Sequence, residues 1–286
     1  MNKMRSMLVA LVALMVLGTG SAQAFWIGSI SDGDGNWVSN VEGLDWAAAG
    51  SGVAVGLANP ANIIVGNTFD FYFQARLTGL TDPAGQPVAF PGLGLDFEYT
   101  LVGKLQEKIT NVVDLGGPVL SAFETTGVGS WYLLYDDVAD SVTASGVGYD
   151  DGTIVAEGTW LPGQISTFTA TVPGVQGIGS YILEGLRGIG TFVDPTYLDP
   201  TLWNGEQLIS GIRFEGTTNV PALSSTTSAF FDGPGVYDTY AVTPADLLFK
   251  VDGSSTFNVV PEPSTIILLG LGFLGLAGCA RRKINK

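Results

Sequence analysis

Five residues near the start of the chain, Asp32-Gly33-Asp34-Gly35-Asn36, place oxygen-bearing side chains at alternate positions. Ca²⁺ takes carboxylate and amide oxygens as ligands, and glycines open the backbone between them. The complete EF-hand pattern fails, because its sixth position is Trp37 and its twelfth is Gly43. Two interpretations stay open: a looser Ca²⁺ turn with Asp32, Asp34 and Asn36 as ligands, and a solvated turn in which aspartate bonds the local backbone.

Paired carboxylates are a second source of chemistry, since they hydrolyse glycosides without histidine. Asp136-Asp137 and Asp150-Asp151 are such pairs, although adjacent residues in a strand point to opposite faces. All 27 acidic residues lie between Phe25 and Pro263, so suitably spaced pairs arise by chance and none is singled out. We expect no enzyme and no cofactor apart from Ca²⁺. A secreted carbohydrate-binding or glycoside-hydrolysing protein is the alternative.

Tryptophans provide the other route to sugars, because their rings stack on sugar rings. Core packing is nevertheless their commoner fate. The candidates are Trp37, Trp46, Trp131, Trp160 and Trp203.

Two absences exclude whole classes of site. The chain has no histidine, and its one cysteine, Cys279, lies in a C-terminal apolar run. Ser-His-Asp and Cys-His nucleophiles and ordinary zinc or copper sites are therefore excluded. Without disulfides, the rest of the chain must be held together by its hydrophobic core, and it is long enough to form one.

The N-terminus has the pattern of an export signal. Lys3 and Arg5 precede an apolar run at residues 7–18, and Ala22-Gln23-Ala24 supplies the small residues of a cleavage site. We expect a signal helix within residues 1–24 and cleavage before Phe25. The apolar run is too short for a spanning anchor.

The C-terminus combines a turn, an apolar run and a basic end. Pro261-Glu262-Pro263 removes two backbone donors, so no helix or central strand continues through it. As a helix, residues 264–280 would be about 25 Å long, slightly short of the ~30 Å hydrocarbon core. Arg281, Arg282 and Lys283 follow, and their side chains would snorkel from this transmembrane helix to the cytoplasmic surface.

This order of features resembles the PEP-CTERM sorting signal of Gram-negative bacteria. The resemblance implies that residues 260–286 are held transiently in the inner membrane and cleaved by an exosortase. The body, residues 25–259, would then reach the cell surface or the extracellular polysaccharide. From the residues alone, a plain single-pass anchor is the alternative.

Removing both ends makes the protein strongly acidic. Residues 25–263 contain six basic and 27 acidic residues, a net charge of −21 over 239 residues. Such a surface repels nucleic acid and anionic membranes and attracts divalent cations. We expect no nucleic-acid partner.

The body has the pattern of an all-β protein. Phe69, Phe71 and Phe73 alternate with polar residues, and this period of two indicates a strand with one buried face. Short strands between Gly, Pro, Asn and Asp clusters predict an antiparallel β-sandwich or jelly roll. The predicted strands are residues 54–58, 68–77, 95–101, 107–113, 130–136, 152–160, 166–172, 211–216, 226–231 and 246–257, with helical turns expected at 194–202.

A second resemblance covers much of the body. The sequence segments that carry it include Trp131-Tyr132-Leu133-Leu134-Tyr135-Asp136 and Gly148-Tyr149-Asp150-Asp151-Gly152-Thr153, with others at residues 66–75, 192–197 and 246–253. They are similar to those of flocculation-associated PEP-CTERM proteins. The resemblance implies a role in holding cells together within exopolysaccharide and carries over no site residue. We expect an exported, non-catalytic matrix protein that promotes cell aggregation, with exosortase and exopolysaccharide as partners.

Overall fold

The computed structural model describes residues 24–25, 27–172, 176–186, 193–199, 208–220, 229–231 and 239–260. Most of these residues are in strands, and the one helix among them is a 3₁₀ turn, η1 (Pro60–Asn62). Within these ranges, no helix is long and apolar enough to cross a membrane. The predicted signal and transmembrane helices lie outside the described residues. So do the predicted site residues Ala22, Pro261, Glu262, Pro263, Arg281, Arg282 and Lys283.

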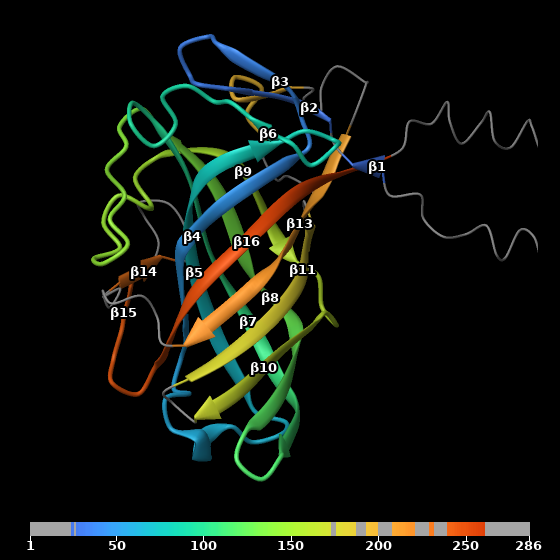
Figure 1. The fold of residues 1–286 in the computed structure, drawn as a ribbon, viewed down its shortest axis with the longest axis vertical. Coiled ribbons are helices and arrows are strands. Elements are labelled where there is room, and N and C mark those ends of the chain that lie inside the picture. The colour runs from blue at the N-terminus through green and yellow to red at the C-terminus, as the bar shows by residue number, and fades with distance from the viewer. Residues whose placement is uncertain are drawn as a thin grey trace, which may run out of the picture. The chain divides into compact units, whose positions relative to one another are not determined.

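Strands follow one another along the whole described chain (Figure 1). They are β1 (Ala24–Phe25), β2 (Gly28–Ser31), β3 (Trp37–Val41), β4 (Gly43–Ala54), β5 (Thr68–Thr81), β6 (Pro87–Val88), β7 (Glu98–Asp114), β8 (Val119–Asp136), β9 (Thr153–Trp160), β10 (Ile165–Val172), β11 (Gln176–Leu186), β12 (Leu198–Asp199), β13 (Leu208–Val220), β14 (Ala229–Phe231), β15 (Thr239–Ala241) and β16 (Leu247–Val260).

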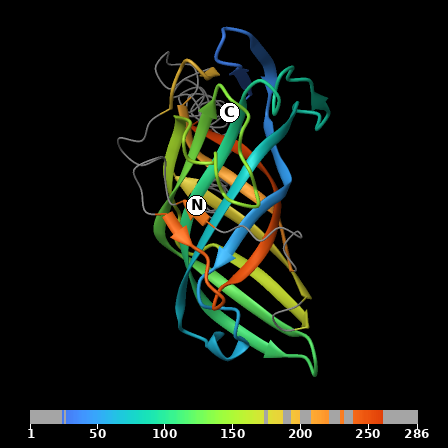
Figure 2. The same ribbon diagram turned by 90° about the vertical axis from the view of Figure 1, so that its left-hand side faces the viewer.

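One large sheet forms the body and closes on itself. Its order is β1-β16-β13-β11-β10-β8-β7-β5-β4, and β16 also pairs with β4. That antiparallel pairing runs from Leu247↔Ala54 to Thr256↔Gly43. Figures 1 and 2 show the long strands tilted around a common axis. The predicted all-β, antiparallel fold is confirmed, and opposing walls of the sheet face each other across the core.

Alternation along the strands places aromatic side chains inside the closed sheet. On β5, Phe69 and Phe73 are buried in this interior, as period two predicts. Phe69 meets Phe123 of β8 edge to face, with ring centroids 5.3 Å apart. Phe73 meets Trp160 of β9 at 5.7 Å. Such contacts between distant strands stabilise the core beyond the area that they bury.

The outer face of β5 is covered as well. Tyr72 points away from the interior, yet it is buried and stacks on Tyr240 of β15 with centroids 4.8 Å apart. Phe230 of β14 belongs to the same cluster and is fully buried. The small β14–β15 sheet therefore adds a second layer on this wall.

A third sheet, β12-β2-β3, lies at the end of the closed sheet opposite to η1 (Figure 1). Two tyrosines of the large sheet hold it. The hydroxyl of Tyr99 donates to the carbonyl of Ser31 at 2.6 Å, and that of Tyr135 donates to the carbonyl of Asp32 at 2.5 Å. The Asp32 turn is thus tied to the core.

The strand predictions were correct where alternation is strong. Residues 68–77, 152–160, 166–172 and 246–257 lie in β5, β9, β10 and β16 almost as predicted. The strand predicted at 54–58 is wrong, because β4 ends at Ala54 and a turn follows. The two strands predicted at 95–101 and 107–113 are one strand, β7, which begins at Glu98. Residues 95–97 precede it, and Leu95, predicted to face the core, is exposed. β2, β3, β4, β6, β11, β12 and β15 were not predicted. β12 lies within residues 194–202, where helical turns were expected.

Candidate functional site

The predicted Ca²⁺ loop forms a tight turn between β2 and β3. Asp32 Oδ1 accepts hydrogen bonds from the backbone N–H groups of Asp34 (2.9 Å) and Asn36 (3.0 Å). Its Oδ2 accepts one from Asn36 Nδ2 at 2.6 Å. Partial desolvation raises the pKa of Asp32, but these hydrogen bonds outweigh it and lower the pKa. The geometry is that of an Asx turn, the second of the two interpretations, while Ca²⁺ binding stays a prediction.

A group of three carboxylates lies elsewhere in the described part of the chain. Oxygen atoms of Asp136, Asp140 and Asp151 lie within 4.8 Å of one another. Desolvation and the neighbouring carboxylates raise the pKa of Asp151. The sequence pairs Asp136-Asp137 and Asp150-Asp151 therefore contribute one member each to a cluster whose third member, Asp140, was not predicted.

The tryptophans divide between the core and the surface. Trp46, Trp131 and Trp160 are buried, whereas Trp37 on β3 is 41% exposed. Trp203 lies outside the described residues. Of the described candidates for sugar stacking, Trp37 is the one that a polysaccharide can reach.

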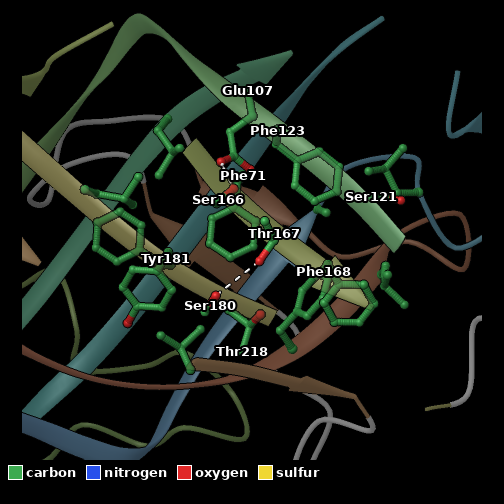
Figure 3. Close-up of a pocket in the computed structure, with 18 of the residues that line it drawn as sticks. Phe71, Glu107, Ser121, Phe123, Ser166, Thr167, Phe168, Ser180, Tyr181 and Thr218 are labelled. Atoms are coloured by element: carbon green, nitrogen blue, oxygen red, sulfur yellow. Dashed lines mark hydrogen bonds between the residues drawn. The ribbon is translucent and has the colours of Figure 1, made fainter. Parts of the chain in front are cut away.

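A cavity of about 280 Å³ lies inside the closed sheet (Figure 3). Most of its lining is apolar, and aromatic rings from different strands surround it. Phe71 and Phe249 lie 5.8 Å apart between ring centroids, and Phe168 meets Phe249 edge to face at 5.2 Å. The lining continues to Pro60 and Asp114, which are exposed, so the cavity reaches the surface at this end of the sheet.

One acidic side chain, Glu107 of β7, points into this apolar interior and is only 6% exposed. Ser166 Oγ of β10 donates a hydrogen bond to Glu107 Oε1 at 2.6 Å. Burial raises the pKa of Glu107 to about 7, although the hydrogen bond from Ser166 opposes the shift. Within the described lining, no lysine or arginine compensates this carboxyl.

The local sequence contains one signal for this site. Glu107 alternates with Leu105 and Ile109, both of which are buried. A glutamate in register with two inward apolar residues shares their face of the strand. Nothing in the local sequence, however, indicates that Ser166 lies opposite.

Comparison with known families gives one match. The PEP-CTERM protein-sorting motif matches residues 259–283. The chain carries a PEP-CTERM sorting motif. The matched range contains Pro261-Glu262-Pro263 and the basic residues Arg281, Arg282 and Lys283.

The PEP-CTERM motif identifies the chain as an exosortase substrate, exported to a cell-surface or membrane-anchored state. The match covers the motif alone, so the resemblance of the body to flocculation-associated proteins stays a prediction. Comparisons with curated proteins and with solved structures find no match.

Proposed function

We propose that this chain is the precursor of a non-catalytic matrix protein that promotes cell aggregation within the exopolysaccharide of a Gram-negative bacterium. The observation that carries the proposal is the sorting motif at residues 259–283 directly after an acidic, all-β body. An exosortase would release this body from the inner membrane.

The charge distribution of the body supports bridging through divalent cations. Acidic residues outnumber basic ones by 27 to six in residues 25–263. Two of the six are already paired: Lys104 Nζ lies 2.8 Å from Asp70, and Arg213 lies 3.4 Å from Glu215. A surface with such an excess of carboxylates attracts divalent cations, which can link it to other anionic surfaces.

Direct contact with polysaccharide is the second part of the proposal. Trp37 is exposed on β3. Its partner on β2, Ser31, accepts a hydrogen bond at its carbonyl from Tyr99 of the closed sheet. A rigidly supported indole ring is suited to stack on a sugar. A glycoside hydrolase with paired carboxylates remains the alternative. In that case the purified body releases sugars from the polysaccharide, and one Asp or Glu substitution abolishes the release.

Deletion and complementation in the host test the proposal. Cells without the gene should stop forming flocs, measured as the fraction of cells that settle, and the full chain should restore settling. A chain with alanine at Pro261, Glu262 and Pro263 should not restore it. Pro83→Ala, in an exposed turn, is the matched control and should restore settling.

EDTA tests the bridging part separately. It should disperse the flocs of wild-type cells, and added Ca²⁺ should reverse the dispersal. Normal flocculation by the deletion strain would contradict the proposed function as a whole. Flocs that resist EDTA would contradict divalent bridging alone.

A further inference from the structure

The cavity inside the closed sheet has the properties of a small-molecule site. Its volume of about 280 Å³ is close to the lower end of typical ligand pockets, ~300–1,000 Å³. Ligand pockets are mostly apolar, with a few polar groups that orient the ligand. Here rings such as Phe71, Phe168 and Phe249 supply the apolar walls, and Glu107 is the buried acidic group among them. Space of this size inside a core destabilises the fold when nothing fills it.

The end of the sheet provides a path into the cavity. Pro60 and Asp114 line the cavity and are exposed, the first on η1 and the second at the end of β7. Exposed apolar side chains occur on the same two segments: Ile64 and Val65 after η1, and Leu115 in the β7–β8 turn, are 54%, 56% and 58% exposed. Figures 1 and 2 show both segments at the same end of the closed sheet. An apolar rim favours entry of an apolar molecule.

Glu107 determines which head group the site accepts. Ser166 donates to Oε1 at 2.6 Å, and no basic side chain of the described lining faces the carboxyl. A second anion in this apolar space would repel a charged Glu107 and lose its own hydration. A hydroxyl or amino group, in contrast, can donate a hydrogen bond to the carboxyl oxygen.

We propose that the closed sheet binds a small, uncharged apolar molecule whose single hydrogen-bond donor meets the carboxyl of Glu107. Ser166 is the positioning residue, because its hydrogen bond fixes the orientation of the carboxyl. This binding is independent of sorting and aggregation, so it stands or fails apart from the proposed function.

Two fluorescent probes of similar shape test the proposal. N-phenylnaphthylamine is uncharged and carries an N–H donor, and anilinonaphthalenesulfonate carries a sulfonate on the same rings. Each is titrated into purified residues 25–263, which contain every strand that lines the cavity within one compact unit. We expect saturable binding of one uncharged probe per chain, with the sulfonate at least about tenfold weaker. Absence of saturable binding of the uncharged probe would overturn the proposal.

Variants on adjacent positions of β10 locate the bound probe. Ala170 lines the cavity, so Ala170→Phe should fill it and weaken the uncharged probe at least about tenfold. Thr169 points to the other face, and Thr169→Phe is the matched control that should bind like wild type. Equal binding by Ala170→Phe and wild type, with circular dichroism unchanged, would place the probe elsewhere and overturn the proposal.

Variants of Glu107 test the head-group contact. Glu107→Leu removes the acceptor and should abolish the preference for the uncharged probe over the sulfonate. Glu107→Gln keeps an acceptor oxygen and should retain binding of the uncharged probe. If Glu107→Leu keeps the same preference, the carboxyl does not recognise the ligand and the proposal is wrong in this part.

Discussion

Ser166 and Glu107 form a hydrogen bond across an intervening strand. The serine hydroxyl on β10 donates to the carboxyl on β7 at 2.6 Å, while β8 lies between these strands in the sheet. The side chains can meet because both point to the inside of a curved sheet. The carboxyl of Glu107 is thereby held among the aromatic rings that line the cavity.

The pH dependence of stability should report on Glu107. Its pKa is raised from 4.5 to about 7 in the folded state, so the folded chain holds a proton that the unfolded chain has lost. The stabilisation is complete below pH 4.5 and is lost as the pH rises through about 7. The free energy of unfolding should fall in total by an amount on the order of 3 kcal/mol over this pH range. Urea unfolding from acid to neutral pH measures it.

Glu107→Gln isolates this effect, because glutamine does not titrate. As the pH rises from 4.5 to about 7, the free energy of unfolding of the wild type should fall relative to that of Glu107→Gln. Glu124→Gln, on β8, controls for removal of a carboxylate from the sheet. A constant difference between wild type and Glu107→Gln across this range would contradict the buried carboxyl.

Asp246 should be important for stability where the chain enters β16. Its Oδ1 accepts from Gly56 N at 2.8 Å, and its Oδ2 accepts from Tyr240, Thr243 N and Thr243 Oγ1 at 2.8–2.9 Å. Burial raises its pKa, but these hydrogen bonds outweigh burial and lower it. The stabilisation is present above pH 3.8 and is lost as the pH falls through the folded-state pKa. Asp246→Asn should cost about 2 kcal/mol at neutral pH.

Asp137→Asn is the control for this substitution, since Asp137 is exposed. Thermal unfolding of both variants makes the comparison. Equal melting temperatures would show that the Asp246 hydrogen bonds contribute little.

The Asp32 turn should behave as a turn with or without Ca²⁺. Asp32→Ala removes three acceptor contacts and should destabilise the body by about 1 kcal/mol. Melting curves with millimolar Ca²⁺ and with EDTA provide the measurement. If Ca²⁺ raises the melting temperature of the wild type but not that of Asp34→Asn, the first interpretation of this loop, the ion site, is favoured.

Gly129 should not tolerate a side chain. Its φ is +111°, and a Cβ there would collide with the backbone carbonyl of Lys104 on β7. Gly129→Ala should therefore cost about 3 kcal/mol or more, through strain and a displaced strand. Gly85→Ala, at φ +72° with open space around it, is the matched control and should cost about 1 kcal/mol. Chemical unfolding distinguishes the two.

Trp37 should contribute to polysaccharide binding without contributing to stability. Trp37→Ala should reduce the amount of body that sediments with the host exopolysaccharide and leave the melting temperature unchanged. Ile165→Ala removes an exposed apolar side chain from β10 and is the control. Unchanged sedimentation of Trp37→Ala would remove the stacking part of the proposed function.

The sequence predicted the strands in which bulky residues alternate with polar ones, as Phe69, Phe71 and Phe73 do on β5. It did not predict β4 and β11, which are rich in glycine and therefore show no alternation. In the folded chain, rings of neighbouring strands occupy the space of the missing side chains: Phe71 lies against Gly52, and Phe168 lies against Gly177. A single sequence contains no local sign of such complementarity.

The candidate sites likewise divide into one that the local sequence indicates and one that depends on contacts between distant strands. The Asp32 turn was visible because its bonds are local, two to four residues apart. The cavity was not visible, because its walls come from strands spread over most of the body. Ser166 and Glu107 are 59 positions apart, and no periodicity encodes their meeting.

The sheet closes only when β16, the last strand to be synthesised, pairs with β4, one of the first. Trp46 on β4 donates its ring N–H to Ser255 on β16 at 2.8 Å, across 209 positions. The ribosome completes β4 long before β16 exists, so the edge of β4 has no partner until nearly the whole chain has emerged. Pairing over such separations is slow. One edge of β4 therefore stays unpaired until the last strand is made, directly before the sorting motif at residues 259–283.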